Sequence, residues 1–214
     1  MPDRAPLSRL VLRTPRLELR LPSDEELLAL ARVAQDGVHD PQRMPFLVPW
    51  TDPSPTFVED FLAYHRAVRE RWRPETWRLE LAVFLAGRPI GIQVIDAEDF
   101  ARSRTTGSAS WLGIGWHGHG YGTEMRAAIL ELAFSGLNAR TAVSGAFEDN
   151  PASARVSIKL GYVSDGVRWP RVRGRPVHEN RFRLTREQFE ATDHVTVTIE
   201  GLDHCRSLFG VTCG

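Results

Sequence analysis

The sequence predicts one domain of mixed helices and strands, of the α/β or α+β class, in which helices cover the faces of a single sheet. Its 214 residues suit one domain with a short extension. Segments with the alternation of strands and segments with helical periodicity follow one another, and Ser or Thr capping signals precede several helical ones. We expect a single domain over residues 1–214, with a core over about residues 10–190 and a C-terminal strand and tail over residues 191–214.

The composition argues against several classes of function. Lys plus Arg number 27 and Asp plus Glu also number 27, so no excess of positive charge indicates nucleic-acid binding. No apolar run approaches the ~18 residues of a membrane helix, and residues 1–16 lack the apolar core of a signal peptide. Cys205 and Cys213 are too few for a disulfide framework or a four-ligand zinc site. We expect a cytoplasmic protein with no membrane partner.

The first elements are a strand and a helix, followed by an irregular segment. Residues 16–21 alternate polar and apolar side chains, as a half-buried strand does. Ser23 and Glu26 then form a capping box at the start of a helix. Residues 37–55 carry five prolines among large apolar side chains, which prevents regular structure but not packing. We expect an ordered loop there.

A second helix and three strands come next. Thr56 and Glu59 offer another capping box, with apolar residues at helical spacing behind it. Two apolar runs on either side of a turn at residues 87–89 predict a β-hairpin over residues 79–95. A third strand is expected over residues 107–112.

The second half of the chain continues with helices and strands. A helix begins near Thr123, and Gly136 stands where a left-handed residue after a helix belongs. Thr185 and Gln188 form a capping signal for a last helix. The other expected elements are a strand over residues 141–147, a helix over 151–160 closed by Gly161, and strands over 162–167, 177–184 and 195–200.

A glycine-rich segment lies directly before the helix near Thr123. Residues 115–125 place Gly118, Gly120 and Gly122 at alternate positions, so backbone N–H groups can face a ligand with no side chain in the way. Because a helix N-terminus follows, the segment is suited to bind phosphate.

Three alternative roles stay open for this glycine-rich segment. A G-x-G-x-x-G frame of dinucleotide-binding folds begins at Gly113, but residues 136–147 supply no acidic residue to hold the ribose. His117 and His119 could share one face as metal ligands, but no Cys or third His stands nearby. The glycines could also serve only the tight packing of a helix on the sheet.

Two motifs together resemble the GNAT superfamily of N-acyltransferases. Residues 117–122 fit its acyl-CoA loop, [QR]-x-x-G-x-[GA], from the second position onward. Residues 150–153, NPAS, and 159–162, KLGY, resemble the Asn and short helix that follow the next strand in that family. The resemblance implies the GNAT fold, a mainly antiparallel central sheet flanked by helices with a splayed cleft for coenzyme A (CoA).

Longer stretches narrow the resemblance. TPRLELRLP and NPASARVSIKLGY are similar to the RimJ/RimL-type acetyltransferases. Residues 37–51, the segments TEMRAA and FEDNPAS, and the tail EGLDHCRSLFG are similar to an actinobacterial group that includes a mycobacterial GNAT described as succinyl-CoA-dependent. The similarity implies an enzyme that moves an acetyl or succinyl group from CoA to a primary amine by direct attack in a ternary complex.

The resemblance also implies partners and contacts. Acyl-CoA, as acetyl-CoA or succinyl-CoA, is the cosubstrate, and no metal is involved. The acceptor amine is a protein N-terminus, a lysine or a small molecule, and the strand over residues 195–200 with the tail could pair with a second subunit in a homodimer. The expected CoA contacts are Trp111, Leu112, Gly113, His117, Gly118, His119, Gly120, Tyr121, Gly122, Thr123, Asn150 and Ser153.

Departures from the family pattern affect the chemistry. His117 stands where Arg or Gln is usual, and His119 where a basic residue is frequent. Since imidazole titrates at about pH 6.5, the backbone must do most of the diphosphate binding. Ser157 stands where many relatives have a Tyr that serves the leaving thiolate. Ser153 fits the RimL-like alternative, a hydroxyl that hydrogen-bonds the departing sulfur, unless it caps the helix instead.

The sequence leaves the general base open. Glu148 and Asp149 end the strand beside the expected thioester, and His39 with Asp40 lies in the loop that would line the acceptor side. Glu148 and Asp149 could equally be solvated or capping residues.

Other residues of the ordered loop bear on substrate choice. Met44, Phe46 and Trp50 could wall an acceptor pocket or belong to the core. Arg43 and Arg155 are candidates to bind the carboxylate of a succinyl donor. The rival class of function is a binding protein that keeps the CoA cleft without catalysis and senses acyl-CoA.

Overall fold

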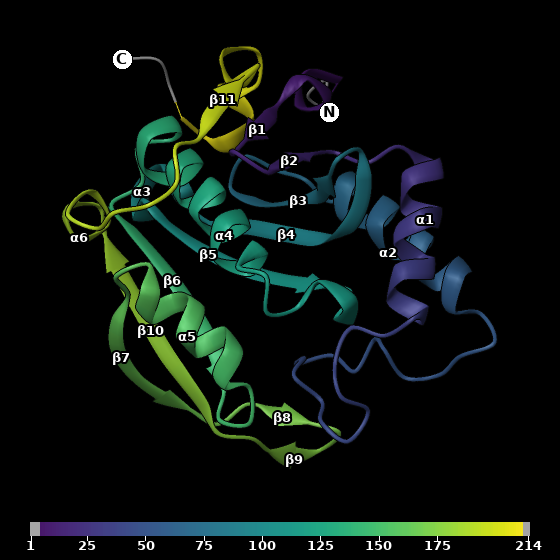
Figure 1. The fold of residues 1–214 in the computed structure, drawn as a ribbon. Helices are drawn as coiled ribbons and strands as arrows, with labels where there is room; N and C mark the ends of the chain where they lie inside the picture. The colour runs from purple at the N-terminus through teal and green to yellow at the C-terminus, as the bar shows by residue number, and fades with distance from the viewer. Residues whose placement is uncertain (1–4, 212–214) are drawn as a thin grey trace.

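Residues 5–211 are described by the structure, a computed structural model (Figure 1). Within them nine strands form one sheet, in the order β11-β1-β2-β3-β4-β5-β6-β10-β7. These strands are β1 (Val11–Arg13), β2 (Leu17–Arg20), β3 (Thr76–Leu85), β4 (Arg88–Glu98), β5 (Thr105–Leu112), β6 (Thr141–Phe147), β7 (Val163–Arg168), β10 (Glu179–Thr185) and β11 (Thr198–Glu200). A separate hairpin consists of β8 (Arg171–Val172) and β9 (Arg175–Pro176).

Six α-helices lie within the described residues: α1 (Asp24–Gln35), α2 (Phe57–Glu70), α3 (Phe100–Ser103), α4 (Tyr121–Glu131), α5 (Pro151–Lys159) and α6 (Arg186–Glu190). None of them is long and apolar enough to span a membrane. Neighbouring strands of the sheet are antiparallel except β5 and β6, which are parallel. The predicted class, a mixed and mainly antiparallel sheet flanked by helices, is confirmed.

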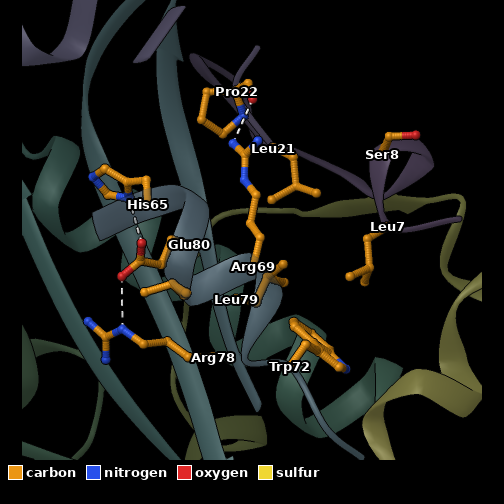
Figure 2. Close-up of a pocket in the computed structure, with 11 residues that line it drawn as sticks. Leu7, Ser8, Leu21, Pro22, His65, Arg69, Trp72, Arg78, Leu79 and Glu80 are labelled. Carbon is orange, nitrogen blue, oxygen red and sulfur yellow. Dashed lines mark hydrogen bonds and ion pairs between the residues drawn. The ribbon is translucent and has the colours of Figure 1, made fainter. Parts of the chain in front are cut away.

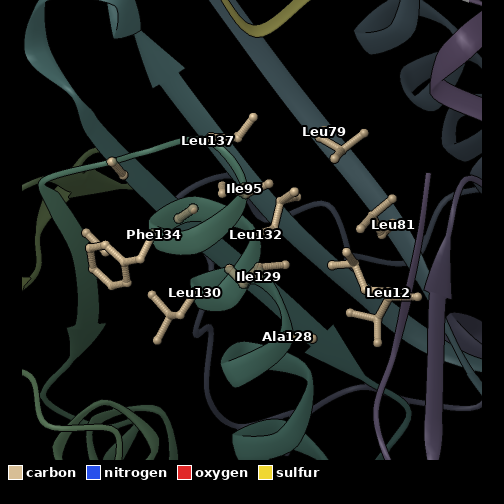
Figure 3. Packing of buried hydrophobic residues seen from close by; sticks show 14 of the residues in the cluster. Leu12, Leu79, Leu81, Ile95, Ala128, Ile129, Leu130, Leu132, Phe134 and Leu137 are labelled. Carbon is tan, nitrogen blue, oxygen red and sulfur yellow. The ribbon is translucent and has the colours of Figure 1, made fainter. Parts of the chain in front are cut away.

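The two faces of the sheet bury different helices. On one face α1 and α2 pack through Leu27, Leu30 and Phe61 against Phe84 and Val94. On the other face α4 fills the larger core. Figure 3 shows leucines of β1 and β3 beside the side chains that follow one another along α4 and the turn after it.

The sheet opens between β5 and β6. Their pairing runs only from Thr105 opposite Thr141 to Gly107 opposite Val143. β5 continues to Leu112, held on its other side by β4, and β6 continues to Phe147, held on its other side by β10. The two strands therefore diverge, as the predicted splayed cleft requires, while each keeps its second neighbour.

Two of the three predicted capping boxes are present. Those that begin with Ser23 and Thr185 are confirmed, each with both reciprocal bonds. The box predicted at Thr56 is wrong: its hydroxyl donates to the Asp60 carboxylate at 2.7 Å and makes no bond to the helix backbone.

The prediction that Gly136 ends a helix as a left-handed residue is also wrong. α4 passes into a π-helical turn, Leu132–Gly136, and the left-handed residue that follows is Asn138, with φ of 59°. A Cβ on Gly136 would lie 2.9 Å from Leu202. Gly136 thus permits close packing of the tail rather than termination of the helix.

The C-terminal segment completes the core instead of extending from it. β11 pairs with β1 of its own chain, so this edge of the strand is not free for a second subunit. The indole N–H groups of Trp72 and Trp77 donate to the carbonyls of Leu208 (2.9 Å) and Phe209 (3.2 Å). The Phe209 ring packs edge-on against both indoles.

We expect Phe209→Ala to lower the free energy of unfolding by about 3–5 kcal/mol, because it empties a fully buried site against two indole rings. Urea denaturation measures this loss. Asp203→Ala, in the same segment with a 92% exposed side chain, is the control and should stay within about 0.5 kcal/mol of the wild type. Equal stability of the two variants would contradict a structural role for the tail.

Candidate active site

Alternate residues of β5 present their backbone groups to the opening. Gly113 donates its N–H to the Ile90 carbonyl of β4 at 2.9 Å. In an antiparallel ladder, residues directed to one neighbour alternate with residues directed away from it. The N–H groups of Ser110 and Leu112 therefore face the opening, where no strand within residues 5–211 pairs with β5 beyond Gly107.

The glycine loop lies at the wide end of the opening. After β5 the chain makes a short 3₁₀ turn, Ile114–Trp116, and then reaches Gly118 and Gly120 with φ of 80° and 83°. Both are left-handed values that suit glycine. α4 begins at once with Tyr121, so the positive end of the helix dipole points at the loop.

The two loop histidines are held in different ways. His117 Nε2 lies 2.9 Å from the Leu112 carbonyl, to which it donates, so its ring turns back over the end of β5. The ring of His119 stacks on that of Tyr121, with 5.8 Å between ring centres. Both residues are exposed.

A guanidinium from Arg16, the residue before β2, reaches the same loop. Arg16 donates to the His119 carbonyl at 3.1 Å and lies over the Tyr121 ring. Its Nε also donates to the buried Glu124 carboxylate of α4 at 2.7 Å. A permanent charge thus lies where the sequence offered only imidazoles.

The start of α5 lies beside α4, where Val156 is 3.7 Å from the position of a Cβ on Gly122. The Asn150 side chain caps α5 by accepting the Ser153 N–H at 3.2 Å. The cap therefore uses the amide of Ser153 and not its hydroxyl. Ser157 is fully buried, with its hydroxyl 3.4 Å from the Ser153 carbonyl.

The splayed strands lead into the left-handed glycine loop, and the capped helix α5 lies beside the start of α4 that follows this loop. A family model described as an acetyltransferase (GNAT) domain matches residues 16–163. The chain belongs to the GNAT acetyltransferase family. As a GNAT protein it is an N-acyltransferase enzyme, and the fold predicted from the resemblance is confirmed.

Solved GNAT structures share this fold at low sequence identity. Mycobacterium smegmatis RimJ, in complex with CoA-disulfide, is 16% identical, with 94% of this chain and 95% of that chain covered and a TM-score of 0.66. RimL, the ribosomal L7/L12 alpha-N-protein acetyltransferase, in complex with coenzyme A, is 15% identical. The match covers 82% of this chain and 97% of that chain, with a TM-score of 0.67. A chimera of the Vibrio cholerae spermidine N-acetyltransferase SpeG is 15% identical. The match covers 86% of this chain and 99% of that chain, with a TM-score of 0.60.

Two of the candidate bases of this GNAT chain lie at the exposed end of β6. The Glu148 carboxylate is 74% exposed and 3.3 Å from His178 Nδ1. Asp149 is also exposed, and its backbone carbonyl accepts a hydrogen bond from Arg43 at 3.5 Å. Arg43 thereby joins the ordered loop to the end of β6.

The third candidate base, His39, has both ring nitrogens engaged. Nδ1 lies 2.8 Å from the Asp40 carbonyl and must donate to it, which makes Nε2 the acceptor for the Thr51 hydroxyl at 2.7 Å. In this tautomer the imidazole can accept a proton from an amine only after the Thr51 hydroxyl turns away.

Another carboxylate, Asp96 of β4, lies at the narrow end of the opening. It covers Gly107 so closely that a side chain on this glycine would collide with it. Asp96 accepts a hydrogen bond from Arg78 at 2.8 Å. Burial raises the pKa of Asp96, and the Arg78 charge only partly opposes this. A carboxylate with a raised pKa beside the cleft is a further candidate base.

Aromatic side chains border the face on which an acceptor would approach. Trp50 of the ordered loop packs against Trp111 of β5 with 5.5 Å between ring centres, and Phe46 packs against Trp50 at 5.2 Å. Phe46 and Trp50 are only partly buried, and Ala109, two residues before Trp111, is exposed. Arg173 of the β8–β9 hairpin forms an ion pair with Asp52, which links the hairpin to the ordered loop (Figure 1).

A separate cavity of about 220 Å³ lies between α2 and β3 (Figure 2). It arises because β2 stops pairing with β3 after Arg20 opposite Ala82. His65 donates to Glu80 at 2.6 Å and Arg78 donates to the other oxygen at 2.8 Å. Burial alone would raise the pKa of Glu80, but these two partners outweigh it and lower the pKa. The cavity contains none of the predicted site residues.

Cysteine and metal chemistry find no support among residues 5–211. Burial raises the pKa of the Cys205 thiol to about 11, which makes it a poor nucleophile, and Cys213 lies outside the described residues. No group of three or more His, Cys, Asp or Glu side chains in the described part of the chain could hold a metal ion.

Sequence reasoning missed Arg16 and Asp96 as candidate site residues. Arg16 and its loop partner are 103 residues apart, so no local pattern joins them. Gly107 did carry a signal for Asp96, because a glycine inside a strand often marks close approach by another group.

We expect Arg16→Gln to weaken CoA binding about tenfold, because the loop loses a charge-assisted hydrogen bond and a nearby cation. Calorimetry with CoA measures the change. Arg13→Gln is a matched control, since the Arg13 side chain is 48% exposed against 46% for Arg16 and pairs away from the loop with Glu18 and Glu200. Equal affinities of the two variants would remove Arg16 from the site.

Proposed function

We propose that the protein transfers an acetyl or succinyl group from CoA to a primary amine by direct attack in a ternary complex. The observation that carries this proposal is the opening between β5 and β6, which ends at the glycine loop and the start of α4. An extended pantetheine arm needs backbone partners along its length, and its diphosphate needs N–H groups at its end. The opening offers both in that order.

The backbone of β5 polarises the acyl group in this proposal. The N–H of Ser110 or Leu112, directed into the opening, donates to the thioester carbonyl and stabilises the oxyanion that forms on attack. The loop at residues 117–123 and Asn150 at the start of α5 bind the diphosphate end. Of the other predicted strand contacts, Gly113 directs its N–H to β4 and Trp111 contributes its ring to the acceptor side.

Proton transfer needs a base for the amine and a partner for the sulfur. Ser153 keeps its hydroxyl outside the helix cap and is proposed to hydrogen-bond the departing sulfur. For the base we retain Glu148, Asp149 and His39 and add Asp96, a carboxylate whose pKa is raised by burial.

The donor and acceptor are proposed at the level of chemical class. If the donor is succinyl-CoA, its carboxylate needs an Arg, and Arg43 and Arg155 remain candidates. We propose a protein N-terminus, a lysine or a small amine as acceptor, which is supported in part by the similarity to a protein N-terminal acetyltransferase and to a spermidine N-acetyltransferase.

A second candidate function is an acyl-CoA sensor that binds without turnover. The absence of a Tyr at position 157 and the engaged nitrogens of His39 favour it. Free thiol release from acetyl-CoA and succinyl-CoA with a peptide N-terminus, a lysine peptide and a polyamine separates the two functions. We expect turnover with at least one pair, whereas tight CoA binding without turnover on any amine would favour the sensor.

Gly118→Val should raise the KM for acyl-CoA at least about tenfold, because a side chain there blocks the approach of the diphosphate to the backbone. Gly87→Val is the matched control. Gly87, in the β3–β4 turn, has φ of 78° against 80° for Gly118, and a Cβ meets nothing within 4 Å at either place. Both variants carry roughly 1–2 kcal/mol of backbone strain, so an equal KM in steady-state assays would contradict loop binding.

A further inference from the structure

A buried cation lies beneath the narrow part of the opening. Arg126 projects from α4 and is 3% exposed. Its guanidinium reaches across the gap, with Nη1 donating to the Ser144 hydroxyl of β6 at 3.0 Å and Nη2 to the Ser110 hydroxyl of β5 at 3.4 Å. The charge is therefore placed under both diverging strands, beside Ser110, whose backbone N–H faces the opening.

Several polar atoms around this cation lack a hydrogen bond of normal geometry. Arg126 Nε, the Ser108 hydroxyl and the Tyr162 hydroxyl are all buried without a hydrogen bond of normal geometry. Tyr162 lies near both Ser108 and Arg126, but burial raises its pKa, so it stays a neutral phenol. Buried donors without a well-formed hydrogen bond need an explanation, and a catalytic role toward a ligand atom is one of those known in proteins.

No carboxylate neutralises Arg126 within the described residues. On α4 itself, Glu124 is paired with Arg16. Asp96 of β4 and Glu179 of β10 lie over Gly107 and Gly145, which by strand alternation belong to the opposite face from Ser108 and Ser144. Asp96 and Glu179 are also paired, with Arg78 and Arg168.

A side chain that served only to link Ser110 of β5 to Ser144 of β6 would not need a positive charge. Two serine hydroxyls can accept hydrogen bonds from a neutral amide as well as from a guanidinium, and burying a cation without a carboxylate partner is unfavourable. Proteins keep an unfavourable feature such as a buried, unpaired cation mainly at functional sites, where a ligand or the reaction supplies the missing negative charge.

We propose that Arg126 is a catalytic residue that stabilises the thiolate leaving from CoA, an inference that rests on the proposed function. The amine nitrogen attacks the thioester carbonyl carbon, the C–N bond forms, and the C–S bond breaks with its electron pair going to sulfur. The amine proton goes to the base, and the sulfur departs as a thiolate beside the guanidinium until solvent protonates it. This role replaces the Tyr that Ser157 does not provide.

The test is the pKa of the CoA thiol in its complex with the protein, followed by the ultraviolet absorbance of the thiolate across a pH titration. We expect the wild type to lower this pKa below that of free CoA, with a thiolate fraction about tenfold higher at a given pH, equivalent to one pKa unit. Arg126→Met should return the pKa to that of free CoA, and Arg126→Lys should restore part of the effect. A wild-type complex with the pKa of free CoA overturns the proposal without any variant.

Two controls separate the effect of the Arg126 charge from a change in the shape of the opening between β5 and β6. Desulfo-CoA, which lacks the thiol, should bind the wild type and Arg126→Met with equal affinity. If Arg126→Met and the wild type share one lowered thiol pKa, the proposal fails although CoA binds. If the thiol pKa shifts but no amine is acylated, the proposed function and the catalytic role fail, and only the binding of the CoA thiolate by Arg126 stands.

A third result would reassign the cation. If Arg126→Met raises the KM for succinyl-CoA but not for acetyl-CoA, and leaves the thiol pKa unchanged, the guanidinium binds an acyl carboxylate and the thiolate role is overturned. A parallel loss of kcat with both donors, at unchanged KM, is the expected outcome.

Discussion

The structure depends on holding two parallel strands apart. Unpaired backbone groups inside a sheet are costly, so β5 and β6 would gain hydrogen bonds by closing. Each strand is instead fixed by its other neighbour, β5 by β4 up to Leu112 and β6 by β10 along its length. α4 lies beneath the gap, and its position depends in turn on the core built from β1, β3 and the C-terminal tail. The opening is thus maintained by the whole domain and not by the loop beside it.

Much of the fold could be predicted because its signals are local. Alternating strands, the boxes at Ser23 and Thr185, and the left-handed Gly161 each depend on a few neighbouring residues. The capping box at Thr56 failed because of a near neighbour, Asp60, but other failures arose where a distant partner decides the outcome. Gly136 is required by packing against Leu202, and the strand near the C-terminus pairs with β1 almost 190 residues earlier. The β8–β9 hairpin, two residues in each strand, is too short for any periodicity.

The candidate site also has a part that could be predicted from local sequence and a part that depends on distant residues. The glycine loop could be recognised because its function resides in consecutive backbone positions. Its cation could not, since the guanidinium comes from Arg16 and the loop itself has only His117 and His119. Arg126 occupies an ordinary position in a helical pattern, and only the three-dimensional structure shows that it is buried without a carboxylate. A single sequence does not show which charged side chains share one face of a sheet, and so it cannot show that a buried arginine lacks a carboxylate there.

Amide hydrogen exchange, measured residue by residue with and without saturating acetyl-CoA, tests most directly whether the opening holds the cosubstrate. If it does, the amides of Ser110 and Leu112 and those of residues 118–122 exchange more slowly in the complex, while the already paired amides of β3 change little. Protection confined to the cavity beside His65, with Ser110 and Leu112 unchanged, would contradict acyl transfer in the gap between β5 and β6.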